Sequence, residues 1–394
     1  MNEQKPPVHG DEVSPDDLVE DYEIEVDELP EELLEESTKS KTVKTLILTG
    51  VGVFVLAAMW FVATNFTGTI PNLCAQVLRE ALKPQTAAVA IAVIGLNIHF
   101  GFTGLLNIGQ AGFMLLGAYG FAIALSNGLP IWLAVLIGLA CAAVFSLLLG
   151  IPTLKLRGDY LAIVTISAAE ILRYVGRLSQ LGDVTGGSHG LAGSAYRGSF
   201  TDLSFFGDGR TAVGPFNYHN TGVDGWWVRA VAWATVAVVL LIVWLLVRSP
   251  WGRLLRGVRE DEDAIRSLGK NVYMIKMQAL LIGGSLGALG GMIYVLPTSV
   301  QPDAMGRSLT FFIWTALLLG GAATIFGPVL GAILFFSVRI LIRGVTDAVV
   351  PDSIMTTQQA AQFSWVVVGV MLMLLVIFRP QGILGNKREL QFNA

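Results

Sequence analysis

The chain has 394 residues, of which 53% are hydrophobic and only 14% are charged. Soluble globular domains carry about 25% charged residues, so this composition argues against that class and favours a membrane protein. The formal net charge of −4 is unevenly spread, because residues 1–42 hold fifteen acids and three bases, which leaves the rest of the chain with a net charge of +8. A basic body is typical of membrane proteins whose cytoplasmic loops are rich in Lys and Arg.

Residues 1–42 are predicted to form an acidic, disordered cytoplasmic tail. The segment has few aromatic residues and little apolar surface to bury, while its like charges repel one another. It lacks the basic start and apolar core of a signal peptide. Two interpretations stay open for this tail: a docking segment for a cytoplasmic partner, or a solvated extension.

Ten apolar stretches follow, each about long enough for a helix that crosses a bilayer. They are residues 43–65, 84–100, 103–125, 130–152, 160–178, 226–247, 277–296, 308–326, 328–345 and 362–378. The predicted fold class is therefore all-α, a polytopic helical membrane protein with about 10 transmembrane helices. The junctions near Gly101 and Gly327 are too tight for ordinary loops, which is consistent with broken or re-entrant helices.

The orientation follows from a charged island at residues 248–276, which lies between two apolar stretches. It holds Arg248, Arg253, Arg256, Arg259, Arg266, Lys270 and Lys276. Short loops rich in Lys and Arg stay in the cytoplasm, so both termini are predicted to be cytoplasmic. The predicted domains are the tail 1–42, a membrane domain 43–385 and a cytoplasmic C-terminal tail 386–394. Within the membrane domain, 179–225 is the long external loop. Arg339 and Arg343, near the outer end of the ninth span, do not fit this orientation well.

Polar residues inside the spans are candidates for a transport pathway. Asn97, Thr103, Asn107 and Gln110 are interleaved with glycines, which suits either a pathway for a polar or zwitterionic solute or hydrogen bonding between helices. Glu170 lies about ten residues into the fifth span, where a charge is costly. It is predicted to be a pathway or gate residue, the alternative being an internal pair with Arg173 three residues later.

Gly283, Gly287 and Gly291 recur every four residues in the seventh span and predict a smooth face for helix packing. That face suits internal packing or the seam with a second subunit equally well. We expect no metal site and no cofactor, because the two cysteines have no ligand spacing and no catalytic group of residues is visible. The only Gly-Lys pair, Gly269-Lys270, lacks the remainder of a P-loop, so the chain is not expected to be an enzyme that hydrolyses ATP.

A series of ordered motifs carries a family resemblance. They are the segments Gly95–Tyr119, Leu156–Arg173, Thr185–Leu191, Gly252–Gly269, Gly320–Ala332 and Arg379–Gly385. Together these motifs resemble those of branched-chain amino acid ABC importer permeases, and they favour the larger of that family's two permease types. Several motifs in the right order are more specific than any one of them.

The resemblance gives the island at 248–276 a second role. Asp263-Ala264 and Gly269 are similar to a degenerate form of the loop by which such permeases engage their ATPases. The resemblance thus implies a coupling loop that includes Arg256, Glu262, Asp263, Ala264 and Gly269. The alternative is a basic loop that only fixes the topology.

The function implied is that of a permease subunit of an ATP-binding-cassette importer. It would translocate branched-chain or other hydrophobic amino acids across a bacterial plasma membrane. The partners implied are a second permease subunit, two cytoplasmic ABC ATPase subunits, an external substrate-binding protein and membrane lipid, with no nucleic acid. Two alternatives stay open: a permease for urea or short-chain amides on the same scaffold, and an ion-coupled secondary transporter.

Overall fold

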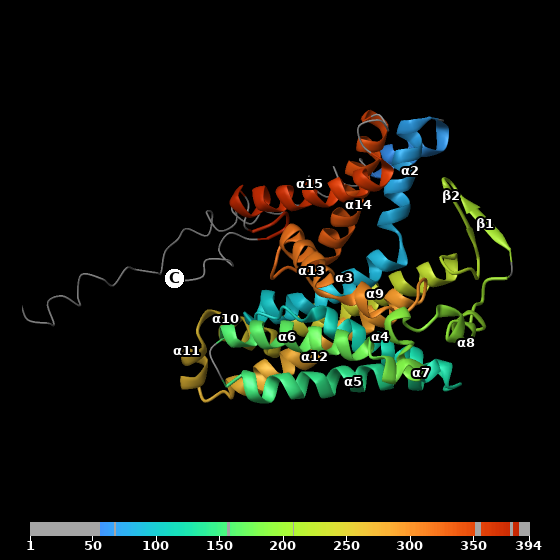
Figure 1. Ribbon diagram of the computed structural model, residues 1–394. Helices are drawn as coiled ribbons and strands as arrows, with labels where there is room; N and C mark the ends of the chain where they lie inside the picture. Colours follow the sequence, from blue (N-terminus) through green and yellow to red (C-terminus); the bar gives the residue numbers. More distant parts are fainter. Residues whose placement is uncertain are drawn as a thin grey trace, which may run out of the picture. The chain divides into compact units, whose positions relative to one another are not determined.

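The structure is a computed structural model that describes residues 56–66, 68–155, 158–207, 209–350, 356–378 and 381–385 (Figure 1). The chain divides into two units, Met1–Ala58 and Met59–Ala394, and the account below concerns the second. The predicted tails 1–42 and 386–394 and most of the first predicted span lie outside the described residues.

The second unit is mainly helical. Its longer helices are α2 (Thr69–Ala81), α3 (Pro84–Leu96), α4 (Gln110–Ser126), α5 (Ile131–Thr153), α6 (Gly158–Gly176), α9 (Trp226–Arg248), α10 (Pro250–Glu260), α12 (Val272–Val295), α13 (Arg307–Gly320), α14 (Gly327–Val349) and α15 (Thr357–Phe378). Five stretches of the described chain are long and apolar enough to cross a membrane: Pro84–Phe102, α5, α9, α12 and α14. This supports a multi-pass membrane protein, while the number of about ten spans and the side on which each terminus lies stay predictions.

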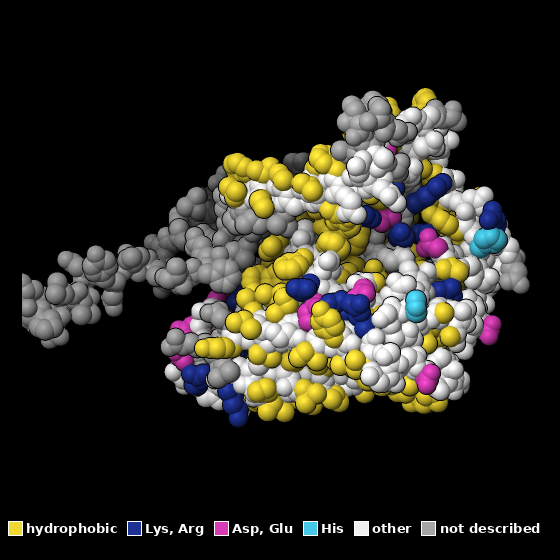
Figure 2. All heavy atoms as spheres, viewed as in Figure 1, with side chains coloured by type: hydrophobic (Ala, Val, Ile, Leu, Met, Phe, Trp, Pro, Cys, Tyr) yellow, Lys and Arg dark blue, Asp and Glu magenta, His cyan; other side chains and the backbone are white. Residues whose placement is uncertain are grey.

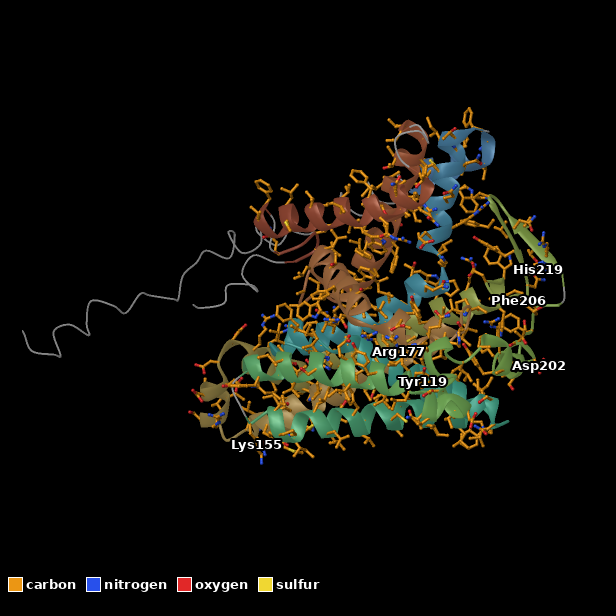
Figure 3. The ribbon with its side chains drawn as sticks, in the orientation of Figure 1. Tyr119, Lys155, Arg177, Asp202, Phe206 and His219 are labelled. Carbon is orange, nitrogen blue, oxygen red and sulfur yellow. The ribbon has the colours of Figure 1, made fainter. Side chains whose placement is uncertain are left out.

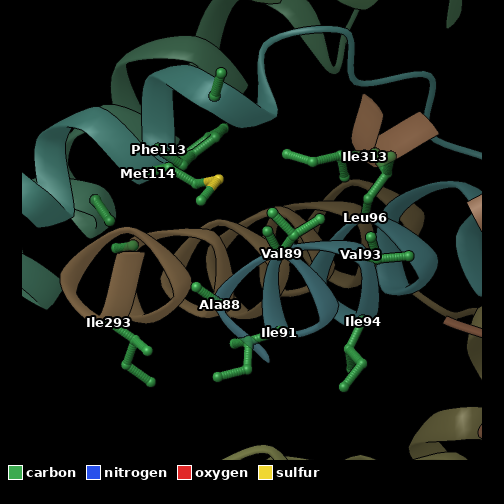
Figure 4. Packing of buried hydrophobic residues seen from close by; sticks show 14 of the residues in the cluster. Ala88, Val89, Ile91, Val93, Ile94, Leu96, Phe113, Met114, Ile293 and Ile313 are labelled. Carbon is green, nitrogen blue, oxygen red and sulfur yellow. The ribbon is translucent and has the colours of Figure 1, made fainter. Parts of the chain in front are cut away.

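The core forms around α3 and α12, which pack against each other and against α4. Residues 87–94 of α3 are buried on every side, since each is at most 1% exposed. A helix that is apolar all round lies either in a protein core or in contact with lipid, and the burial of α3 places it in the core. Figure 4 shows side chains of α3, among them Val89 and Leu96, packed among those of α4, α12 and α13.

Several helix ends differ from the predicted spans, because hydropathy marks membrane depth and not backbone geometry, and three of them have a visible cause. The predicted 277–296 span begins at Val272, where the Asn271 side chain accepts a hydrogen bond from Met274 N at 3.1 Å and caps the helix. The predicted 308–326 span ends at Gly320, because Gly321 has a φ of +107°. The predicted 103–125 span becomes helical only at Gln110, after a π-helix, η2 (Asn97–Phe102), and an irregular stretch.

The segment 179–225 is ordered into short elements. They are η3 (Ser179–Leu181), α7 (Gly182–Thr185), η4 (Gly187–His189), η5 (Gly193–Ala195), α8 (Gly198–Thr201), β1 (Arg210–Val213) and β2 (Phe216–His219). The strands pair antiparallel, with Arg210 opposite His219 and Val213 opposite Phe216. This hairpin is the one sheet in the described residues, and the all-helical prediction did not include it.

Two side chains of this segment fasten it to the end of α12. Arg197 donates from Nε to Leu296 O at 2.6 Å and from Nη2 to Thr298 O at 2.7 Å. Tyr196 donates its hydroxyl to Val295 O at 2.8 Å. The carbonyls at the C-terminus of a helix have no partner within the helix and carry the negative end of its dipole, so an arginine is a favourable cap there.

Candidate coupling surface and transport pathway

Residues 250–267 form two short helices, α10 and α11 (Glu262–Ser267), separated by Asp261. The Asp261 carboxylate caps α11 by accepting from Asp263 N at 2.8 Å and from Ala264 N at 3.0 Å. Beyond the helix, Gly269 takes a φ of +73°, and its N–H donates to Arg266 O at 2.9 Å. Acids at the start of a helix and a left-handed glycine after it are the signals that stabilise so short a helix.

One face of α11 is held by the chain and another is exposed. On the held side, Ile265 packs against Gly257 of α10, and Glu262 pairs with Lys276 of α12. On the other side, Asp263 and Ala264 are exposed, and the Leu268 side chain just after the helix is 73% exposed. In Figure 1, α11 lies beside α10 at one end of the bundle formed by α5, α6 and α12. The surface that it presents is therefore available to another protein.

Arg256 lies on the neighbouring helix and faces the break between α3 and α4. Its guanidinium carbon is 5.9 Å from the centre of the Phe102 ring. The predicted coupling loop is thus in contact with the region that contains the predicted pathway residues.

A buried polar network joins that break to α12. His99 Nε2 lies 3.2 Å from Leu280 O, so it is the nitrogen that carries the proton. Asn107 Nδ2 then donates to His99 Nδ1 at 3.0 Å and to Gln110 Oε1 at 2.9 Å. Gln110 Nε2 donates to Ala92 O and Gly283 O, each at 3.2 Å. All three polar side chains are fully buried.

Asn97 and Thr103 belong to separate contacts. Thr103 bonds only to its own turn, donating to Ile98 O at 2.8 Å. Asn97 reaches the loop after α13, where it donates to Thr324 O at 2.7 Å and accepts from Ala323 N at 2.8 Å. Protein groups therefore satisfy the polar atoms of the predicted pathway residues in this conformation. This is the arrangement expected for hydrogen bonding between helices, and their role in a pathway stays a prediction.

The glycine stripe of α12 lies against α3 and α4 of the same chain. A Cβ on Gly283 would collide with His99 Nε2, and one on Gly291 would collide with Met114 O. A Cβ on Gly287 would come within 2.7 Å of Gln110 Nε2. In the structure, the stripe thus serves internal packing, one of the two interpretations of the sequence pattern.

Glu170 belongs to a cluster of five charged side chains. Arg173 Nη2 lies 2.8 Å from Glu170 Oε2, and Arg307 Nε lies 3.4 Å from Glu170 Oε1. Asp303 pairs with Arg173 and, at 3.3 Å, with Arg177. Figure 3 labels Arg177, and Figure 2 shows a patch of mixed charge near the middle of the visible face, bordered by apolar side chains. The side chains of Glu170 and Arg173 are only 17% and 12% exposed.

Several residues of these sites could not be predicted from the sequence pattern. Asp303 and Arg307 lie more than 120 residues from Glu170, and no spacing rule connects them with it. In the sequence, Arg259 is one of several positive charges of the island, and no local pattern indicates that its guanidinium reaches the carbonyl of Gly101. The described residues contain no group of three His, Cys, Asp or Glu placed to hold a metal ion.

Comparisons with known proteins bear on this arrangement. The family model described as "Branched-chain amino acid transport system / permease component" matches residues 81–376. The "High-affinity branched-chain amino acid transport system permease protein LivM" of Escherichia coli (strain K12) is 31% identical over 361 residues, which are 86% of this chain and 75% of the relative. The "Probable branched-chain amino acid transport permease protein LivM" of Methanocaldococcus jannaschii is 24% identical, over 75% of this chain and 90% of the relative. Among solved structures, an inward-facing metal-chelate type ABC transporter aligns with a TM-score of 0.42 and 15% identity, covering 84% of this chain and 99% of that chain.

Proposed function

The chain belongs to the branched-chain amino acid transport permease family, and from this premise we propose that it is the permease subunit of an ABC importer for branched-chain amino acids. The family resemblance of its motifs is thereby confirmed. Five long apolar stretches in the described residues agree with a subunit that is embedded in the membrane.

One structural observation most directly supports transport driven by ATP hydrolysis. The helix α11 is capped at both ends, packed on α10 along one side and exposed along Asp263 and Ala264. A loop that only set the topology would have no need of a capped helix held in a fixed position. The chain carries no P-loop, so the ATP hydrolysis belongs to two cytoplasmic ATPase subunits that dock on this surface.

The remaining partners follow from the same proposal. A second permease subunit completes the pathway, and an external substrate-binding protein delivers the amino acid to the side that holds segment 179–225. The complex resides in a bacterial plasma membrane, with the tail 1–42 and α11 in the cytoplasm.

One experiment distinguishes the proposed importer from its two alternatives, an amide permease and an ion-coupled secondary transporter. The complex is reconstituted with its ATPases, second permease and binding protein in proteoliposomes that enclose ATP. Uptake of labelled leucine, isoleucine and valine is compared with that of urea and acetamide. Uptake of the three amino acids that stops when the P-loop lysine of the ATPases is replaced supports the proposal. Preference for urea or acetamide favours the amide permease, and uptake driven by a proton or sodium gradient without ATP favours a secondary transporter.

A further inference from the structure

A direct contact joins α10 to the break between α3 and α4. Arg259, on α10, donates from Nη1 to the carbonyl oxygen of Gly101 in η2. The Arg259 side chain is only 8% exposed, and its ionic neighbour Glu260 lies 4.0 Å away and is itself 74% exposed. A guanidinium buried to this degree needs a fixed acceptor, and the Gly101 carbonyl is the one that the protein interior supplies.

The backbone around the Gly101 carbonyl is closely packed. Gly104, at a φ of +76°, packs on the stem of Arg259, since a Cβ there would lie 3.1 Å from Arg259 Cγ. A Cβ on Gly101 would collide with Asn97 Oδ1 and come within 2.5 Å of Ala323 N. The space beside Gly101 is therefore filled by the Asn97 amide, so a shift of the Gly101 peptide displaces that amide.

The Asn97 amide in turn holds the loop between α13 and α14. It bonds to both Ala323 N and Thr324 O. Ala323 has a φ of +61° and is the single non-glycine residue with a positive φ in the part of the chain that the structure describes. Such a conformation is disfavoured for alanine and persists only where its surroundings hold it. Asn97 supplies two of the bonds that do so.

We propose that Arg259 is a positioning residue of the transport cycle, which passes a displacement of α10 through Gly101 and Asn97 to the loop between α13 and α14. The inference rests on the proposed function and extends it beyond the docking surface on α11. Close-packed groups joined by single hydrogen bonds move together, because the interior has no free volume in which a shift could be absorbed. The break between α3 and α4 and the loop between α13 and α14 lie more than 200 residues apart in sequence. Through Arg259, both are linked to α10.

The functional test separates coupling from assembly. Arg259→Gln removes the charge and shortens the reach, whereas Arg259→Lys keeps a cationic donor. In Arg259→Gln we expect normal co-purification of the ATPases, ATP hydrolysis within about twofold of wild type, and uptake per ATP lowered about tenfold. Arg259→Lys should recover part of that loss. Arg253→Gln, on an exposed position of the same helix, removes an equal charge without touching Gly101 and should keep the wild-type ratio.

Asn97→Ala should give the same uncoupling, and the double variant should be no worse than either single change, because both break one chain of contacts. An unchanged uptake per ATP in Arg259→Gln would overturn the proposal. So would the same loss in Arg253→Gln, since the effect would then come from charge alone.

A second measurement does not depend on transport. Hydrogen exchange of the Ala323 amide, followed by mass spectrometry on the purified protein, should lose protection in Arg259→Gln and in Asn97→Ala but not in Arg253→Gln. Retained protection in Arg259→Gln would overturn the mechanical link. If the wild-type complex takes up none of the amino acids, the proposed function fails, whereas this exchange result still decides whether Arg259 positions the loop.

Discussion

Glu170 and Arg307 come from different elements and meet at 3.4 Å, from Glu170 Oε1 to Arg307 Nε. Because Arg173 also binds Glu170, one carboxylate is shared by two arginines. Arg173 is shared in its turn by two acids, Glu170 and Asp303. The cluster therefore ties α6 to η6 (Pro302–Met305) and to the start of α13. Its contacts are not equivalent: Arg173 makes the two shortest ones, at 2.8 Å to Glu170 and 2.5 Å to Asp303, whereas Arg307 and Arg177 lie 3.4 Å and 3.3 Å from their acids.

This inequality gives a prediction for Glu170→Gln and Arg173→Gln. Loss of a charged hydrogen bond costs about 1.5–3 kcal/mol of unfolding free energy, so Glu170→Gln should lower the melting temperature in detergent and reduce uptake. Arg173→Gln should be worse, because it removes the two shortest contacts of the cluster, whereas Glu170→Gln removes one of them and the longer contact with the exposed Arg307. The double variant should lose less than the sum of the two.

The control for that prediction is Arg343→Gln. Arg343 pairs with Asp347 at 3.8 Å, and both side chains are more than one third exposed, so the pair should contribute little to stability. Unchanged uptake and melting temperature in Glu170→Gln would remove Glu170 from the candidate residues.

Local signals in the sequence were sufficient for α11 and insufficient for the ends of the membrane helices. The acids at 260–263 and Gly269 are residue types that mark the start and the end of a short helix, and the cap at Asp261 and the φ of Gly269 have that form. Hydropathy, by contrast, continues through residue 326, whereas α13 ends six residues earlier at a glycine turn. The turn depends on a hydrogen bond from Ala323 to Asn97, and no local pattern carries that information.

The polar residues of the candidate site could be listed from the sequence but not assigned to partners. Asn107 and Gln110 are three residues apart, so their contact is local in sequence, although Asn107 lies in the irregular stretch before α4. Asn97 and Thr324 are 227 residues apart and meet only because α13 and α14 pack beside α3. The two hairpin strands flank Gly214-Pro215, which is a turn signal that hydropathy alone does not reveal.

A second prediction concerns the glycine stripe. Gly291→Ala places a methyl group against the backbone carbonyl of Met114, so α12 and α4 must separate. Overpacking of this kind costs about 1–3 kcal/mol, which should lower the melting temperature and the yield of folded protein. Gly369→Ala in α15 is the matched control, because a Cβ there meets no atom within 4 Å. Equal behaviour of the two variants would contradict tight packing along the stripe.

A third prediction concerns the acidic tail. Deletion of residues 2–38 should leave uptake near wild type at matched expression, because a segment of that composition contributes no packed core. Uptake assays in cells with immunoblots of the membrane fraction measure this. Reduced uptake at normal membrane levels would instead identify the tail as a docking segment for a cytoplasmic partner.

The last prediction concerns Gly269, which follows α11 in a left-handed conformation. A Cβ on this residue would meet no atom within 4 Å, so Gly269→Asp acts through backbone strain and through a new charge, and not through a collision. The strain costs about 1–2 kcal/mol, which is enough to loosen a helix of only six residues. The variant should insert and fold normally, but it should lose the co-purifying ATPases or the coupling of their hydrolysis to uptake.

Gly128→Asp is the control for this change. Gly128 has a φ of +77°, is exposed and likewise has open space around its Cα, yet it lies in the turn after α4, on the side predicted to be external. The strain and the added charge are therefore matched, and only the location differs. Loss of the ATPases in Gly269→Asp alone would assign the effect to the surface of α11. Normal ATPase binding with full uptake in Gly269→Asp would show that the ATPases dock elsewhere, because a disturbed α11 could not then be their contact.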